Sequence, residues 1–212
     1  MIGKVLLHNY GQRNEEEDEK FQNASQLYIE ISSFAHALTQ EADSGDFLSL
    51  SPPLALTFSA LYMLCKPYSR LGNNHDGIEL SFSEAAMTMK NQALDGIRTV
   101  SSSIVEFSKK LVAAVHAPED LARVSPVIME SLYAAATNYA WVLRENGDKE
   151  SQHALDTLRQ CLRRLGTKWR GATEYLKILE AQEVSLWLLS SERFPCPSAL
   201  PSSETLYSSL TW

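Results

Sequence analysis

Apolar side chains recur at spacings of three and four residues along most of this chain, which is the period of a helix with one buried face. The longest such run begins behind Ser83 and ends at Val115. Its apolar positions are Ala86, Met89, Ala93, Ile97, Val100, Ile104, Phe107, Leu111 and Val115. The spacing predicts a helix of about 33 residues, which would be roughly 50 Å long. Three consecutive serines at 101–103 mark a place where this helix could kink.

Two kinds of structure could use so long an apolar seam. Two chains could form a coiled coil along it, but the positions beside the seam lack the regular opposite charges that select a partner. A central helix packed by its own chain needs no such charges and is common in all-helical domains. We therefore expect the second arrangement.

Shorter runs of the same period predict further helices on both sides of the long one. They cover approximately residues 23–41, 52–65, 126–145, 154–166 and 169–184. Ile2, Val5 and Leu6 also fit a helical pattern. No segment reads convincingly as a strand. The predicted fold class is all-α: a multi-helix array of about six to seven helices with one long central helix and no sheet.

Serine-proline pairs predict where two of these helices begin. Ser51 and Ser125 each precede a proline, and a hydroxyl cap with proline in the first turn is typical of a helix N-terminus. Pro67 is expected to end the first helix, and the turn around Gly147 to end the second. The second helix is apolar nearly all round, which predicts that it is the most buried in the fold.

Segments without helical period are expected to be loops or tail. The acidic run from Glu15 to Glu19 is interpreted as a solvated loop, and residues 65–81 as a second loop. After Leu189, prolines and serines predict a flexible tail. We divide the chain into a helical domain at residues 1–189, expected to be incomplete at its N-terminus, and a Ser/Pro-rich tail at residues 190–212.

Residues 47–65 form the longest uncharged run and raise the question of a membrane span. Six of its nineteen residues are Ser, Thr or Pro. The helix after Pro53 would be about 18 Å long, against a bilayer core of about 30 Å. A buried helix in a globular core is the better interpretation, and no membrane partner is expected.

Charge and cysteine content exclude several function classes. Nineteen Lys and Arg against 26 Asp and Glu give a net charge of −7, so we expect no DNA binding by this chain alone. Cys65, Cys161 and Cys196 are widely separated, and so predict neither a disulfide framework nor a thiolate zinc site. Without the pattern of a signal peptide, the expected compartment is intracellular and reducing.

Motifs that carry chemistry are absent from the sequence. The histidines show no HExxH or other metal-ligand spacing, and each is expected at a surface or capping position: His8, His36, His75, His116 and His153. The sequence contains no GxGxxG, GxxxxGK[ST] or GxSxG motif. We therefore predict no catalytic, cofactor-binding or metal-binding residue, no cofactor, and a chain that is not an enzyme.

Two local patterns are candidate binding features. Residues 144–177 hold eight Lys or Arg against five acids, and a basic ridge there could meet an acidic partner, although an ordinary solvated helix face is the simpler interpretation. The ridge would consist of Arg159, Arg163, Arg164 and Arg170. Trp169 and Tyr175 fall on one side of the last predicted helix and could line a small-molecule pocket. Core packing explains these aromatic residues equally well and is commoner.

The segment Ser125–Ala181 resembles the regulatory domain of fungal zinc binuclear-cluster transcription factors. A Ser-Pro start leads a helix with a Leu-Tyr-Ala core, a leucine-rich helix follows, and a W-x2-A-x2-Y-L-x2-L pattern comes last. The matching residues are Leu132, Tyr133, Ala134, Leu155, Leu158, Leu162, Leu165, Trp169, Ala172, Tyr175, Leu176 and Leu179. The resemblance extends less specifically over residues 1–181. It implies an all-helical regulatory domain in the nucleus that modulates an attached DNA-binding module.

The chain departs from that family in one respect. The family binds DNA through six closely spaced cysteines that hold two zinc ions, and this chain has no such cluster. The resemblance therefore implies the regulatory part alone, acting through the transcription machinery, a co-regulator or a small-molecule effector. Two alternatives stay open: a helical adaptor or scaffold, for which a repeat near 34 residues would be expected and is not seen, and a small helical enzyme of unknown reaction.

Overall fold

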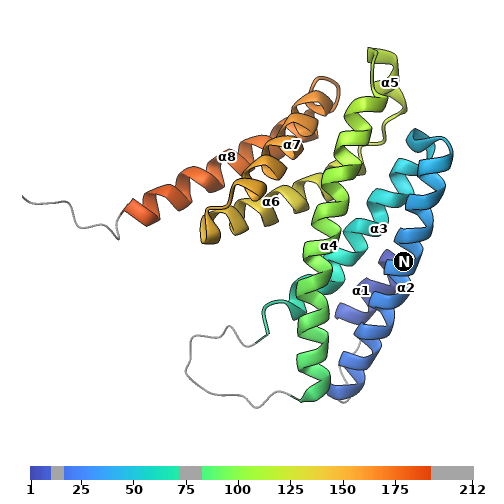
Figure 1. Cartoon of the computed structure of the whole chain (residues 1–212), viewed down its shortest axis with the longest axis vertical. Coiled ribbons are helices and arrows are strands. Elements are labelled where there is room, and N and C mark those ends of the chain that lie inside the picture. The colour runs from blue at the N-terminus through green and yellow to red at the C-terminus, as the bar shows by residue number, and fades with distance from the viewer. Residues whose placement is uncertain (11–16, 72–82, 192–212) are drawn as a thin grey trace, which may run out of the picture. The chain divides into compact units, whose positions relative to one another are not determined.

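The structure is a computed structural model that describes residues 1–10, 17–71 and 83–191 (Figure 1). These ranges form helices and contain no strand, so the predicted all-α fold is confirmed. The helices are α1 (Ile2–Tyr10), α2 (Glu17–Ser44), α3 (Phe47–Tyr68), α4 (Glu84–Ala114), α5 (Pro118–Arg123), α6 (Ile128–Asn146), α7 (Lys149–Gly166) and α8 (Arg170–Ser191). Met1–Leu179 forms one compact unit and Glu180–Trp212 a separate one. The predicted boundary at residue 189 stays a prediction.

The long helix α4 is organised as its sequence predicts. Its N-cap is Ser83, whose hydroxyl accepts a 3.2 Å hydrogen bond from the Ala86 N–H. It continues for 31 residues and is uninterrupted at the three serines. Every seam position is buried except Ile97, which is partly buried. Because α2, α3, α6 and α7 of the same chain pack on α4, the seam needs no second chain.

The most buried helix is α3, not α6 as the sequence predicts. Twelve of the 22 residues of α3 are buried, against six of 19 in α6. The reason is position: α1, α2, α4 and α6 all contact α3, and α2 and α4 lie along it (Figure 1). The second half of α6 is partly buried or exposed, and Trp141 there is 57% exposed.

The start of α3 differs from the expectation that Ser51 caps it. Asp46 is the N-cap, and its carboxylate accepts from the Leu48 N–H at 3.2 Å. Ser51 lies inside the helix, and its hydroxyl donates to the Leu48 carbonyl at 2.8 Å. That carbonyl is the one Pro52 cannot bond, because proline has no N–H. The Ser51 hydroxyl therefore satisfies the carbonyl that Pro52 leaves without a donor inside the helix.

The predicted end of α3 is also wrong, because the helix includes Pro67 and continues to Tyr68. A proline in the interior of a helix leaves one carbonyl without its partner. Here a side chain of α1 bonds that carbonyl, and the Ser69 N–H closes the helix by bonding the Cys65 carbonyl.

Other boundaries shift by smaller amounts. α2 begins at Glu17, so the end of the acidic run is helical. Residues 11–16, residues 72–82 and the tail from residue 192 lie outside the described parts. The short helix α5 is an addition to the predicted elements. The expectation that Ser125 caps α6 is wrong: α6 begins at Ile128 behind Val127, which forms no side-chain cap hydrogen bond, and the Ser125 hydroxyl accepts from the Val127 N–H at 3.4 Å. Gly147, with φ of 64°, ends α6 as predicted.

α3 is long and apolar enough to cross a membrane by length and composition alone. Most of its apolar stretch is buried inside the protein, and the core helix of a globular domain passes the same test. The prediction of a buried core helix agrees with this packing.

Candidate functional site

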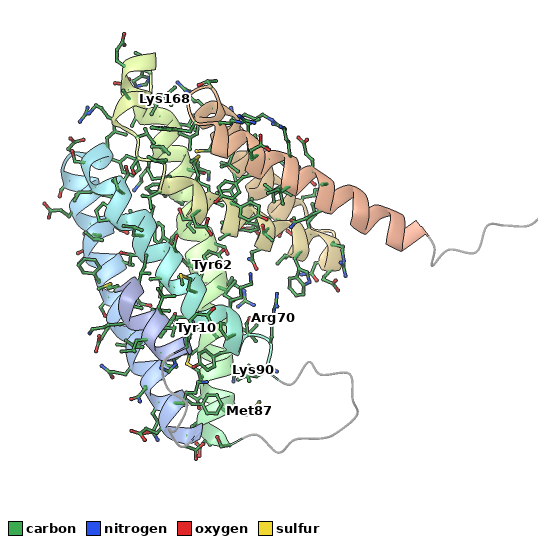
Figure 2. The ribbon with its side chains drawn as sticks, turned by 180° about the vertical axis from the view of Figure 1, so that it is seen from behind. Tyr10, Tyr62, Arg70, Met87, Lys90 and Lys168 are labelled. Carbon is green, nitrogen blue, oxygen red and sulfur yellow. The ribbon has the colours of Figure 1, made fainter. Side chains whose placement is uncertain are left out.

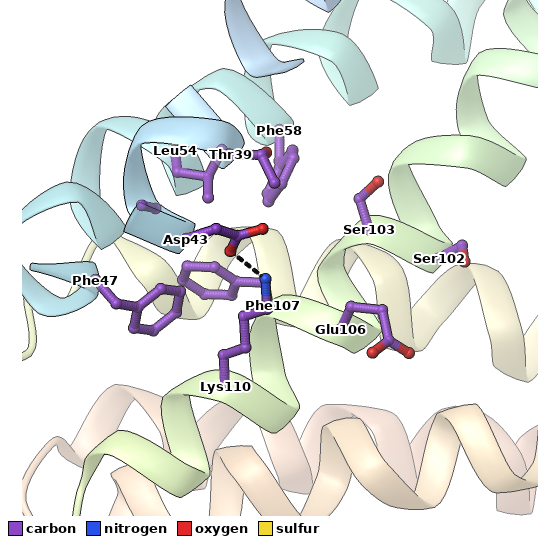
Figure 3. A pocket seen from close by; sticks show the side chains of 11 residues that line it. Thr39, Asp43, Phe47, Leu54, Phe58, Ser102, Ser103, Glu106, Phe107 and Lys110 are labelled. Carbon is purple, nitrogen blue, oxygen red and sulfur yellow. Dashed lines mark hydrogen bonds and ion pairs between the residues drawn. The ribbon is translucent and has the colours of Figure 1, made fainter. Parts of the chain in front are cut away.

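A cavity of about 260 Å³ lies where α2, α3 and α4 meet (Figure 3). Its lining residues are Thr39, Ala42 and Asp43 from α2, Phe47, Leu54 and Phe58 from α3, and Ser102, Ser103, Glu106, Phe107 and Lys110 from α4. The sequence patterns do not predict this site. The one signal near it is the serine run in the apolar seam, which we interpret from sequence as a possible kink.

Three phenylalanines form the apolar wall of the cavity. Phe58 and Phe107 are each 3% exposed, and Phe47 is partly buried. The centroid of the Phe107 ring lies 5.3 Å from that of Phe47 and 6.0 Å from that of Phe58, which it meets edge-on at 85°. Edge-to-face contacts of this kind hold aromatic rings in fixed positions. The three rings of the wall are therefore held in place by contacts with one another.

The edge of the cavity is charged. Lys110 on α4 forms an ion pair with Asp43 on α2 (Figure 3). Glu106, one turn earlier on α4, pairs with Lys109 at 2.7 Å. All four side chains are 44–61% exposed, so these pairs add little to stability. Of the charged residues that line the cavity, two are acidic and one is basic.

Two hydroxyl groups in the lining have no partner within the described parts of the chain. Ser102 and Ser103 form no side-chain hydrogen bond there, whereas the buried serines Ser101, Ser108 and Ser131 each donate to a carbonyl three or four residues earlier. Ser103 is partly buried and Ser102 exposed. Both hydroxyls are free to bind a ligand or water.

The first of the three serines serves a different site, because successive helical residues point about 100° apart. Ser101 Oγ donates to the Ile97 carbonyl at 2.6 Å and accepts from Asn138 Nδ2 at 3.0 Å. Tyr62 also hydrogen-bonds this oxygen, and since the serine proton is used, the phenol donates (Figure 2 shows Tyr62 on α3). Burial raises the pKa of the Tyr62 phenol. Ser101 thus joins α3, α4 and α6.

The predicted basic ridge is not one free surface. Arg159 has a side chain only 14% exposed and lies 3.6 Å from Asp156, while Arg170 lies 3.8 Å from Glu174. Arg164 donates to the Val115 carbonyl at the end of α4. Arg163 is exposed. The structure therefore favours an ordinary helix surface over a ridge shaped for an acidic partner.

Trp169 and Tyr175 do not line the cavity; both are partly buried and pack against the core. Tyr175 stacks on Tyr133 with ring centroids 4.5 Å apart, and its hydroxyl donates to Glu130 at 2.7 Å. This hydrogen bond raises the pKa of Tyr175 to about 12. Trp169 packs on the core, with Lys168 Nζ 5.0 Å from its ring centroid. The Trp169 Nε1 is buried without a hydrogen-bond acceptor among the described residues.

One histidine contradicts the prediction that all are at surface or capping positions. His8 is 5% exposed, and its Nε2 lies 2.5 Å from the Tyr68 hydroxyl. His36, His116 and His153 are exposed as expected, and His75 lies outside the described residues. Within the parts of the chain that the structure describes, no group of three His, Cys, Asp or Glu could hold a metal ion.

Comparison of the chain with protein-family models, curated proteins and solved structures finds no match. The resemblance of residues 125–181 to a transcription-factor regulatory domain therefore stays a prediction from the residues that carry it.

Proposed function

We propose that this chain is the regulatory domain of a fungal transcription factor, which acts in the nucleus through a protein partner or a small-molecule effector and does not bind DNA by itself. The observation that supports the proposal is where the residues of the resemblance lie. They lie on the core-facing sides of α6, α7 and the first part of α8, where eight are buried and the other four are partly buried against the core.

The three matched motifs contribute to one core. The leucine-rich helix has all four of its matched leucines buried, and Leu132, Ala172 and Leu179 are each at most 1% exposed. Tyr133 and Tyr175, from the first and last motifs, stack on each other. Burial of the matched leucines and the contact between Tyr133 and Tyr175 support the proposal.

Helix lengths favour the proposal over an adaptor built from equal helical repeats. Such arrays stack units of one length. The helices in the described ranges vary from six residues in α5 to 31 in α4, and α4 contacts α2, α3, α6 and α7. A single continuous core is the better description.

Charge supports the part of the proposal that concerns DNA. A protein gains affinity for DNA by neutralising phosphates with unpaired Lys and Arg. Arg159 and Arg170 are instead close to carboxylates, and Arg164 donates to a backbone carbonyl. With a net charge of −7, the chain needs a separate module to reach DNA.

The test is a fusion of this chain to an unrelated DNA-binding module, with a reporter gene read out in yeast. We expect the fusion to change reporter output relative to the module alone. The Leu158→Asp variant, which places a charge in the core, should abolish the effect, and Gln160→Asp, on the exposed side of the same helix, should not. A soluble nuclear fusion without effect would overturn the proposal. Tight, sequence-selective gel shifts by the isolated chain would overturn it as well.

A further inference from the structure

We propose that the cavity between α2, α3 and α4 binds a small single-ring amine, with the ring against the phenylalanine wall and the ammonium group at the acidic edge. As an effector site this inference rests on the proposed regulatory function. As a binding site it stands on the cavity alone.

The size of the cavity selects a ligand with one ring. An apolar protein cavity of about 150 Å³ holds benzene. A cavity of about 260 Å³ therefore has room for a six-membered ring and a short arm. Drug-sized ligands occupy larger pockets, of about 300 Å³ and above.

The wall selects the chemistry of the ring. Phe58 and Phe107 are almost fully buried and fixed edge-on to each other, and Leu54 beside them is 2% exposed. An aromatic ring can add a further offset or edge-on contact to such a set, beyond the area it buries. The faces of a sugar or another polyhydroxylated ring would lose water against this wall, where no phenylalanine or leucine side chain can replace those hydrogen bonds.

The edge selects the charge of the arm. Lys110 is already paired with Asp43, so an anionic ligand would have to compete with that carboxylate and would also face Glu106. A cation would in turn have to displace Lys110 from Asp43 or Lys109 from Glu106, but the lining holds two carboxylates and one ammonium group, and the overall charge of −7 also favours a cation. The free hydroxyls of Ser102 and Ser103 can accept hydrogen bonds from an ammonium group.

The experiment compares three probes that share one ring: 2-phenylethylamine, 2-phenylethanol and 3-phenylpropanoate. Binding to the full chain is measured by calorimetry and by ligand-observed NMR. We expect the amine to bind with a Kd on the order of 1 mM or tighter and the carboxylate about tenfold more weakly. Added salt should weaken binding of the amine and leave that of the alcohol nearly unchanged.

Variants locate the binding. Ser103→Leu fills the cavity from a partly buried helical position and should weaken amine binding about tenfold, whereas Ser33→Leu, on the exposed face of α2, should not change it. Glu106→Gln should weaken amine binding about fivefold, and the matched control Glu119→Gln on α5 should have no effect. Circular dichroism confirms that each variant is folded.

Each outcome decides the inference. Equal affinity for amine and carboxylate, no effect of Ser103→Leu, or no binding at millimolar concentration would overturn it. Preferential amine binding that both variants weaken would support it. If the chain binds the amine but the reporter fusion is inactive, the binding site stands and the proposed function is overturned. If the fusion is active but the chain does not bind the amine, the proposed function stands and the binding site is overturned.

Discussion

Asn9 on α1 donates a hydrogen bond from Nδ2 to the Met63 carbonyl oxygen on α3, at 2.9 Å. This carbonyl is the one that Pro67 leaves without a partner, because the N–H of residue 67 would normally bond it. One side chain of α1 therefore satisfies a carbonyl inside α3, the most buried helix, and links the two helices. His8, beside Asn9, adds a buried contact to Tyr68 on the same helix.

We expect Asn9→Ala to destabilise the protein by about 1–2 kcal/mol, since it leaves a partly buried carbonyl unsatisfied. In the background of Pro67→Ala, which restores the N–H, the same substitution should cost clearly less. Urea unfolding of the four proteins of this double-mutant cycle measures the difference. Asn91→Ala, on the exposed face of α4, is the control. Equal losses of unfolding free energy in both backgrounds would show that the Asn9 hydrogen bond does not compensate for Pro67.

The Ser101 hydroxyl should matter more than its neighbours in the serine run. Ser101→Ala removes the acceptor of both the Tyr62 phenol and the Asn138 amide, so we expect a loss of about 1–3 kcal/mol. Adding Tyr62→Phe to Ser101→Ala should recover part of that loss, because it removes the buried phenol hydroxyl that Ser101→Ala leaves without a hydrogen-bond partner. Thermal unfolding provides the comparison. Ser102→Ala, which removes no hydrogen bond of the described chain, should be nearly neutral.

Gly147 is required by its backbone conformation and not by lack of space. Its φ of 64° lies in the left-handed region, and a Cβ added at this position would meet no atom within 4 Å. Gly147→Ala should therefore cost about 1 kcal/mol from backbone strain alone. Gly3→Ala, in an equally open helical position, should be neutral or slightly stabilising. Similar losses at both positions in chemical unfolding would contradict this explanation.

The two cysteines of the described residues should be inert in the folded protein. Cys65 and Cys161 are at most 1% exposed, and burial raises the pKa of each thiol to about 12. In a Cys196→Ser variant, a thiol-specific reagent at pH 8 should label neither cysteine until denaturant is added, when both should react. Rapid labelling without denaturant would mean that the α3 or α7 interior opens.

The same thiols predict how stability changes at alkaline pH. The unfolded chain releases the Cys65 and Cys161 protons near pH 8.5, whereas the folded protein holds them until about pH 12. Above pH 8.5 the unfolded state binds fewer protons, so stability should fall as pH rises from about 8.5 toward 12. Urea unfolding of Cys65→Ala and Cys161→Ala across this range should show a smaller slope than the parent chain.

Helical period and local capping chemistry predict most elements of this fold. The seam from Ala86 to Val115 forms the long helix behind the Ser83 cap, and Gly147 ends α6 where a left-handed residue is expected. The failures are at prolines. The sequence predicts a helix start at Pro52 and a helix end at Pro67, but α3 includes both prolines. The Ser51 hydroxyl and the Asn9 amide bond the carbonyls that these prolines leave without an N–H donor.

The sequence by itself determined that this chain is helical, where its longest helix runs, and which stripe of each helix is apolar, because these properties depend on neighbours within a turn or two. Only the tertiary structure decided that α3 is the central helix and that Ser101 and Ser103 serve different sites. It also decided that Phe47, Phe58 and Phe107 line one cavity with Asp43 and Lys110 at its edge. Burial and binding surfaces depend on contacts between residues far apart in sequence, and helical period carries no information about those.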